Sequence, residues 1–302
     1  MTKIIKSIKP YNEIIYKNCF YHQLMTICNY FNRNLNYIIC NTIFEYSYEN
    51  EFESKIIFKY TIEHLLNLLG IGTSSLDSND FHDSIVNSIN KNNIVILINS
   101  DYKSKDLHRH LTIVHGYNDT EKLYYIIDPS DGNNIYYINT TISFDKLEKK
   151  FTYYKDNLKN YDSNIEFAEL TTTGYIEPNF SNYINFFNDN KSIFKKNYDC
   201  IKSYFSELEN LLNNKKDEEK MKKIIYNFSN FIYEKQILII QSGLIYNSDI
   251  KKAVENLKSK YETIFTIIIR YITENKSDIE NISDKLNNLL LLEKQILDKI
   301  YS

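Results

Sequence analysis

The stretch HLTIVHGYNDTEKLYYIIDP occupies residues 110–129 and decides how the first half of the chain folds. Two runs rich in apolar, β-branched and aromatic residues predict two strands, separated by the turn signal Asn118-Asp119. A tight turn pairs the two strands antiparallel. The pairing returns Asp128, at the end of the second strand, to the side of His110, at the start of the first. The stretch therefore predicts a histidine and a carboxylate together at one end of a sheet.

Side-chain alternation along the first of these strands separates its two histidines. His110 shares one side with Thr112, whereas His115 points to the other side. His110 is therefore the predicted partner of Asp128. The alternative is that residues 128–132 are simply a turn, which would explain Asp128 without any chemistry.

The residues around this strand pair predict an α+β domain over residues 1–175. Apolar residues recur at helical spacing from Phe20 to Phe31, which places Cys19 in the first turn of a helix. Further helices are predicted at 59–69 and 81–91, and strands at 94–99, 110–117, 123–128 and 135–138.

The second half of the chain, residues 176–302, is predicted to be an all-α helical bundle. After Pro178 it contains one glycine, Gly243, and no further proline, and apolar residues recur with a period near 3.6. Four long helices are expected, with breaks at 213–220, 247–249 and 277–280.

The overall composition limits the possible partners and the compartment. A net charge of -3 and a pI of about 6.1 give no electrostatic reason to expect nucleic acid or an anionic membrane. No apolar run approaches the roughly 20 residues of a membrane span, and no signal peptide is recognisable. The four cysteines form no CxxC pair, which fits free thiols in the cytoplasm.

Cys19 is the candidate nucleophile, because a helix N-terminus favours the thiolate. A small apolar residue at a helix start is the alternative explanation. With His110 as base and Asp128 as its orienter, Cys19 completes a predicted catalytic triad. Asn12 and Asn18 are candidate oxyanion donors. His22 lies one helical turn after Cys19 and either lines the pocket or is a surface neighbour.

Metal and nucleotide cofactors are not expected. The histidines and carboxylates between residues 106 and 119 lack the spacing of a structural zinc site, and alternation divides them between two sides of the sheet. The signatures GxxxxGK[ST] and GxGxxG are absent from the sequence.

Taken together, these motifs resemble the C39-type cysteine peptidases, a papain-like fold with an antiparallel sheet. In that family a helix-start cysteine is followed by a strand of the pattern H-Φ-Φ-Φ-Φ-x-G-Y and by a strand that ends in D-P. Here the matching positions are Cys19, residues 110–117 and Asp128-Pro129. The resemblance covers roughly residues 10–150 and implies a thiol active site.

The whole chain is similar to the butirosin-biosynthesis acyltransferase-like family, in which such a domain precedes a helical region. It also resembles amide-forming enzymes of the closthioamide type, which join acyl chains to a diamine. The resemblance implies that Cys19 takes an acyl chain from the phosphopantetheine thioester of an acyl or peptidyl carrier protein and passes it to an amine. Amide formation from a thioester is downhill, so no further cofactor is implied.

Two other functions remain open at this stage. One is a cysteine peptidase that cleaves a peptide or leader with the same triad. Glu13 argues against it, because papain-like peptidases usually carry glutamine at the corresponding position, about six residues before the nucleophile. The other is a non-catalytic binding protein for a peptide-like metabolite.

Overall fold

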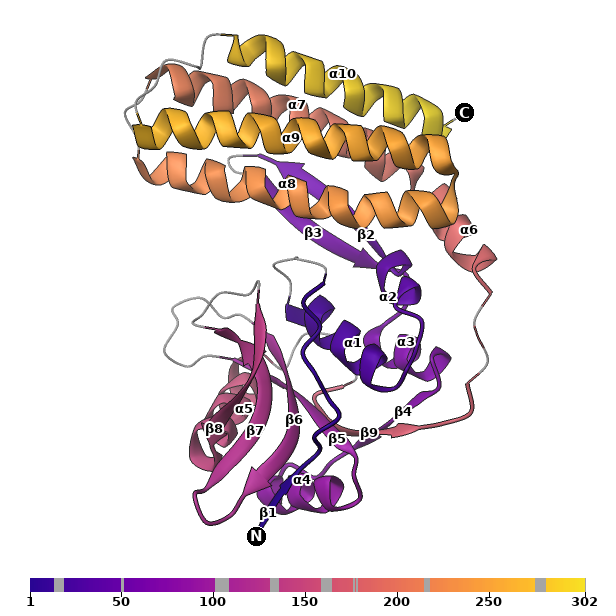
Figure 1. The fold of residues 1–302 in the computed structure, drawn as a ribbon, viewed down its shortest axis with the longest axis vertical. Helices are drawn as coiled ribbons and strands as arrows, with labels where there is room; N and C mark the ends of the chain where they lie inside the picture. Colours follow the sequence, from indigo (N-terminus) through magenta and orange to yellow (C-terminus); the bar gives the residue numbers. More distant parts are fainter. Residues whose placement is uncertain are drawn as a thin grey trace. The chain divides into compact units, whose positions relative to one another are not determined.

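The computed structural model describes residues 1–13, 19–49, 52–100, 109–130, 136–158, 165–175, 177, 179–214, 218–274 and 281–301. These residues form a mixed α and β structure with an antiparallel sheet and a helical C-terminal region, so the α+β class is confirmed (Figure 1). The chain divides into two compact units. One contains residues 1–38 and 60–178, and the other contains residues 39–59 and 179–302.

The first unit is organised around a sheet in which, among the described residues, β1 pairs with β6 and the other strands follow the order β4-β9-β5-β6-β7-β8. All of these pairs are antiparallel. The strands are β1 (Thr2–Ile4), β4 (Ile71–Ser75), β5 (Ile94–Asn99), β6 (His110–Asn118), β7 (Leu123–Pro129), β8 (Tyr137–Ser143) and β9 (Phe167–Thr172). The predicted positions of β5, β6 and β7 are confirmed, whereas β8 starts and ends later than the predicted strand at 135–138.

The helices of this unit lie against the sheet or beside it. They are α1 (Cys19–Tyr30), α2 (Asn36–Cys40), which continues into the second unit, α3 (Ile62–Leu68), α4 (Phe81–Asn90) and α5 (Phe144–Leu158). The ring of Phe81 on α4 lies 5.2 Å from that of Phe151 on α5 and 5.0 Å from that of Phe167 on β9. Because both helices contact the same residue of β9, α4 and α5 cover one face of the sheet.

Gly116 has a structural reason for its place in the motif of β6. β1 runs so close to β6 that a Cβ atom at Gly116 would lie 2.7 Å from the Lys3 carbonyl oxygen and 3.0 Å from Ile4 Cα. The register between β6 and β7 also shifts between Val114 and Gly116. A glycine at this position therefore lets β1 pair with a strand that carries an irregularity.

The second unit combines a hairpin with the C-terminal helices. β2 (Thr42–Tyr48) pairs with β3 (Phe52–Phe58), and the helices are α6 (Ser181–Asp189), α7 (Lys191–Asn214), α8 (Glu218–Ile245), α9 (Ser248–Glu274) and α10 (Ile282–Tyr301). Residues 176–302 were predicted to form a domain alone. Residues 39–59 correct that prediction, because they group with the helices rather than with the sheet.

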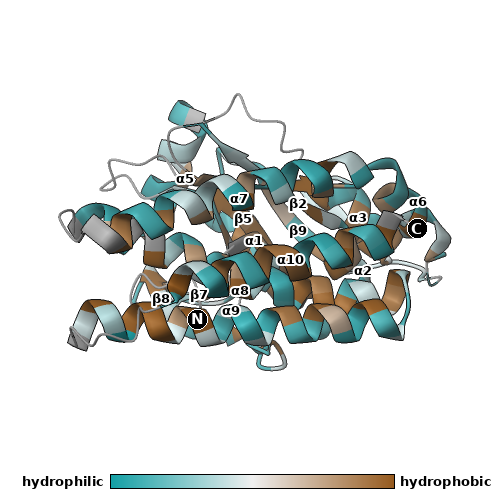
Figure 2. Cartoon of the chain, turned by 90° about the horizontal axis from the view of Figure 1, so that it is seen from above, coloured by the Kyte–Doolittle hydropathy of each residue, from teal (hydrophilic) through white to brown (hydrophobic). Residues whose placement is uncertain are grey.

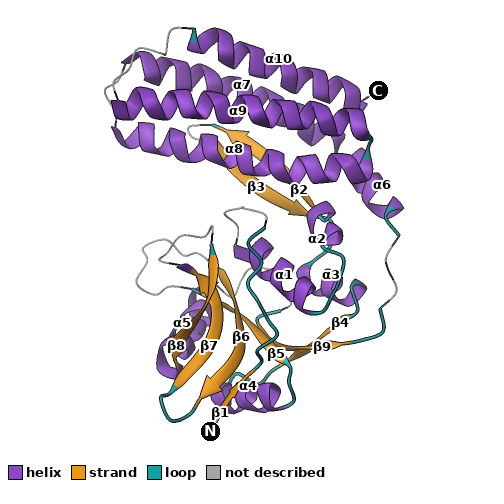
Figure 3. Ribbon diagram, in the orientation of Figure 1, coloured by secondary structure: helices purple, strands orange, loops and turns teal. Residues whose placement is uncertain are grey.

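Side chains from two helices hold this hairpin, which lies beside α8 (Figure 3). Asn197 on α7 accepts from the Tyr46 N–H at 2.8 Å and donates to the Phe44 carbonyl at 2.7 Å. Gln241 on α8 donates to the Thr42 carbonyl at 2.9 Å. In the part of the chain that the structure describes, β2 pairs with β3 alone, so these bonds satisfy the backbone groups on its other edge. They explain why the hairpin belongs to the helical unit.

The long helices match the periodicity of their sequence. Hydrophobic and hydrophilic residues alternate along α9 and α10 (Figure 2), as expected for helices with one apolar face. The ends of α7, α8 and α9 coincide with the three predicted breaks. In the part of the chain that the structure describes, no helix combines the length and the apolar character needed to cross a membrane.

Candidate active site

His110 and Asp128 meet at the ends of β6 and β7. Nε2 of His110 lies 2.5 Å from Oδ1 of Asp128, and the two side chains are 18% and 21% exposed. In the antiparallel pairing of β6 with β7, Ile113 lies opposite Ile127. One step further toward the sheet end, Thr112 lies beside Asp128, and His110 is the diagonal neighbour of Asp128. The predicted contact between His110 and Asp128 is therefore present in the structure.

A chain of hydrogen bonds holds the carboxylate from the neighbouring strands. The Thr112 hydroxyl lies 3.4 Å from Oδ1 of Asp128, and the Asn99 amide donates to Thr112 Oγ1 at 2.8 Å. Asn99 and Thr112 are each 1% exposed, so water does not compete for these bonds. This arrangement orients Asp128, which in turn orients the ring of His110.

Cys19 is the first residue of α1, and no acidic residue occupies the first turn of that helix. The side chain of Cys19 and the whole of Asn18 lie outside the described residues. Four residues after Cys19, the amide of Gln23 donates to the Ile127 carbonyl at 2.7 Å. This bond ties the first turns of α1 to β7 one residue before Asp128. The other atom of this amide, Gln23 Oε1, is buried and has no hydrogen-bond partner among the described residues.

Tyr137, at the start of β8, lies between the helix and the histidine. Its ring stacks on that of His22 with centroids 4.7 Å apart, and it lies nearly parallel to the ring of His110 at 6.5 Å. His22 is 1% exposed, and its Nδ1 lies 3.2 Å from the Tyr11 carbonyl oxygen. His22 is thus buried against the site and is not a helix-surface residue.

Asn12 has partners that the sequence analysis did not predict. Its amide donates to the Tyr137 carbonyl at 2.9 Å, and its oxygen accepts from the Tyr137 N–H at 3.0 Å. Next to it, the Tyr11 N–H donates to Thr26 Oγ1 on α1 at 3.0 Å. Asn12 therefore joins the segment before α1 to β8, and its oxyanion role stays a prediction.

Two other residues discussed from the sequence have defined surroundings. Glu13 is exposed and accepts from the Tyr11 hydroxyl at 3.4 Å; burial and the nearby Glu13 charge raise the pKa of Tyr11 to about 12. His115 is buried with Nδ1 3.3 Å from the Ile5 carbonyl oxygen, and burial lowers its pKa. His115 contacts the residue that follows β1, so it belongs to a different site from Asp128.

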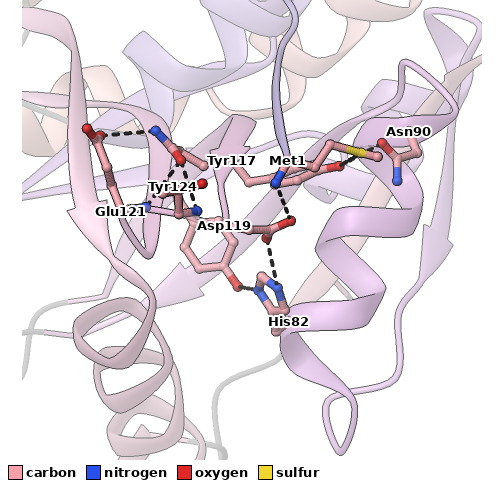
Figure 4. Close-up of polar contacts among 9 residues, drawn as sticks. Met1, His82, Asn90, Tyr117, Asp119, Glu121 and Tyr124 are labelled. Carbon is pink, nitrogen blue, oxygen red and sulfur yellow. Dashed lines mark hydrogen bonds and ion pairs between the residues drawn. The ribbon is translucent and has the colours of Figure 1, made fainter.

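Within the described ranges, no group of three or more histidine, cysteine, aspartate or glutamate side chains is placed to hold a metal ion. Asp106 and His108, considered above, lie outside these ranges. Asp119 instead contacts Nε2 of His82 at 3.5 Å and the amino group of Met1 at 3.4 Å, and His82 Nδ1 lies 2.9 Å from the Tyr124 hydroxyl (Figure 4).

Several residues of the site were missed by the sequence analysis. Thr112 was assigned to the correct side of β6, but its bond to Asp128 was not proposed. Gln23 follows Cys19 by four residues, a spacing that places both on one helix face and would have singled it out. Asn99 and Tyr137 offered no local signal, because their partners come from other segments of the chain.

The comparisons with known proteins assign this chain to no family. No protein-family model matches the sequence, and a search of curated proteins finds no significant match. The chemistry must therefore be argued from the site itself.

Proposed function

We propose that this protein is a thiol acyltransferase that forms an amide bond in natural-product biosynthesis. Cys19 takes an acyl chain from the phosphopantetheine thioester of a carrier protein and passes it to an amine. The observation that carries the proposal is the 2.5 Å contact between His110 Nε2 and Asp128, beside a helix that begins at Cys19. The papain-like character of the first unit is part of the same proposal.

The first half of the reaction loads the enzyme. The Cys19 thiolate attacks the thioester carbonyl, the bond from that carbon to the carrier sulfur breaks, and the carrier thiolate takes a proton from His110. Because Nε2 contacts Asp128, the proton moves through Nδ1, and the carboxylate stabilises the imidazolium. The product is an acyl group on Cys19.

The second half transfers the acyl group. His110 accepts a proton from the amine as its nitrogen attacks the carbonyl carbon, and Cys19 leaves as thiolate. The balance is one thioester and one amine converted to one amide and one free carrier thiol. The N-terminal end of α1 supplies partial positive charge for the tetrahedral oxyanion.

Intact mass spectrometry tests the proposal directly. The full chain is incubated with an acyl-carrier thioester, with and without a diamine, and with a short peptide in parallel. The expected result is an acyl adduct that is absent in Cys19→Ala and an amide that appears only with the amine. Peptide cleavage without an acyl adduct would instead make the protein a cysteine peptidase.

The first unit offers a matched control for His110. His82 also contacts a carboxylate, that of Asp119 at 3.5 Å, but it lies on α4. His110→Ala is expected to lower kcat/KM about 10³-fold, as is usual for removal of a catalytic base, while His82→Ala leaves it within about twofold. Equal losses in the two variants would contradict the assignment of His110.

A further inference from the structure

The second unit contains a cavity of about 50 Å³ that is partly open to solvent. Glu234 and Lys235 of α8 and Glu293 of α10 form part of its polar wall. Phe194 of α7 and Ile296 and Leu297 of α10 are among the apolar residues that line it. All of the residues that line the cavity belong to the helical unit, so it is separate from the site at His110.

The carboxylates of this cavity have unequal partners. Glu293 lies 2.6 Å from Nζ of Lys235 and accepts from the Tyr261 hydroxyl at 2.8 Å. Within the described ranges, Glu234 accepts hydrogen bonds from two hydroxyls, that of Ser54 at 2.6 Å and that of Tyr46. Among the residues that the structure describes, no cation lies within ion-pair distance of Glu234.

A count of charges follows from these contacts. Glu234 and Glu293 contribute two negative charges when ionised, and Lys235 contributes one positive charge. When both carboxylates are ionised, the cluster is therefore one positive charge short of neutrality. Glu234 is 2% exposed, and a buried carboxylate without a cation is costly, because neutral hydroxyls only partly replace its hydration.

The pKa of Glu234 agrees with this count of charges. Burial raises its pKa to about 7, although the hydroxyls of Ser54 and Tyr46 and the charge of Lys235 act in the opposite direction. A cation bound beside the carboxylate would favour the ionised form and lower the pKa again.

The walls of the cavity are held in place without a ligand. Asn197 and Gln241, which line the cavity, bind the backbone of β2 from α7 and α8. Binding then requires little rearrangement of the protein, which lowers its entropic cost.

We infer that this cavity binds a small alkylammonium ion, with the ammonium group at Glu234 and the alkyl chain against Ile296 and Leu297. A volume of about 50 Å³ accommodates roughly four non-hydrogen atoms, since each water-sized group needs about 10–15 Å³. Propylammonium has that size. An anion is a poor fit, because the one lysine that lines the cavity already pairs with Glu293.

Binding by the full chain is measured by titration calorimetry with propylammonium, 1-propanol and propionate. A ligand of about four non-hydrogen atoms is expected to bind with a Kd on the order of 1 mM, and the neutral and anionic analogues at least tenfold more weakly. Below pH 7 propylammonium should release protons from Glu234, which makes the heat depend on the ionisation enthalpy of the buffer.

Two variants and one control locate the site. Glu234→Gln keeps the shape of the side chain and removes its charge, and Leu297→Trp fills the cavity from its apolar wall. Both should weaken binding at least tenfold. Glu207→Gln should bind as the unmodified protein does, because Glu207 accepts from Tyr48 of the same hairpin but does not line the cavity.

Circular dichroism confirms that each variant is folded before its affinity is compared. Equal affinities for propylammonium and 1-propanol would overturn the inference, as would unchanged binding in both Glu234→Gln and Leu297→Trp. Absence of binding up to about 50 mM would overturn it as well. None of these results bears on the cysteine chemistry, because binding alone is measured.

Discussion

The two units each hold a carboxylate against a basic side chain, but in opposite environments. In the first unit His110 and Asp128 are 18% and 21% exposed at the end of a sheet. In the second unit the Lys235 and Glu293 side chains are 6% and 9% exposed among helices. The distances are similar, 2.5 Å and 2.6 Å, so burial and not geometry distinguishes the two pairs.

This difference in burial predicts different consequences when one partner of each pair is removed. A pair at a sheet end can exchange protons with a substrate, and its net effect on folding is small because water already solvates it. A buried pair contributes little net stability, but removal of one partner leaves an uncompensated charge in the core. We therefore expect changes in the second unit to affect folding and changes in the first to affect chemistry.

The largest effect is expected from Lys235→Met, which leaves Glu293 buried without its cation. The free energy of unfolding should fall by about 3–5 kcal/mol, measured by urea denaturation. Lys258→Met is the matched control, because Lys258 lies at the same 2.6 Å from Glu262 on the surface of α9, and its loss should cost less than about 0.5 kcal/mol. Equal losses of unfolding free energy in Lys235→Met and Lys258→Met would contradict the idea that burial sets the size of the effect.

The next effect concerns Glu234 and pH. Its pKa is about 7 in the folded protein against an ordinary 4.5, so the fold favours the protonated form. The resulting stability is fully present below pH 4.5 and is lost as pH rises through about 7. Between pH 4.5 and 8, the free energy of unfolding of the unmodified protein should fall by about 3 kcal/mol more than that of Glu234→Gln. Parallel pH profiles for the two proteins would show that folding does not raise the pKa of Glu234.

The smallest effect is expected in the first unit from Thr112→Val. The variant loses a hydrogen bond to Asp128, which should lower kcat of the proposed acyl transfer about tenfold, or about 1.4 kcal/mol, with little change in unfolding free energy. Thr112→Ser restores the hydroxyl and should recover most of the rate. A stability loss as large as that of Lys235→Met would mean that Thr112 is structural rather than positioning.

Parts of the fold were predictable because their signal is local. The strand pair of β6 and β7 has long apolar runs and a tight turn between them, and the helix breaks after α7, α8 and α9 carry charged and polar residues. By contrast, β4 has the sequence IGTSS, in which four of the five residues are small or polar and no pattern marks a strand. The grouping of β2 with the helices depends on Asn197, about 150 residues later.

The same distinction applies to the candidate site. The contact between His110 and Asp128 spans one hairpin, so strand alternation and the turn sufficed to predict it. The partner of Asn12 was not predicted, because it is Tyr137, 125 residues further along the chain. The environment of Glu234 was also out of reach, since the sequence presents it as one glutamate among many on helical surfaces.

The sequence by itself therefore determined the α+β class, the helical second half and the pairing of His110 with Asp128. These depend on side-chain periodicity and short-range turns, which operate within about 20 residues. Only the tertiary structure decided that residues 39–59 join the helices, that Asn12 binds β8, and that Glu234 is buried with no cation beside it among the described residues. The physical reason is that burial and hydrogen-bond partners are set by packing between segments far apart in the chain.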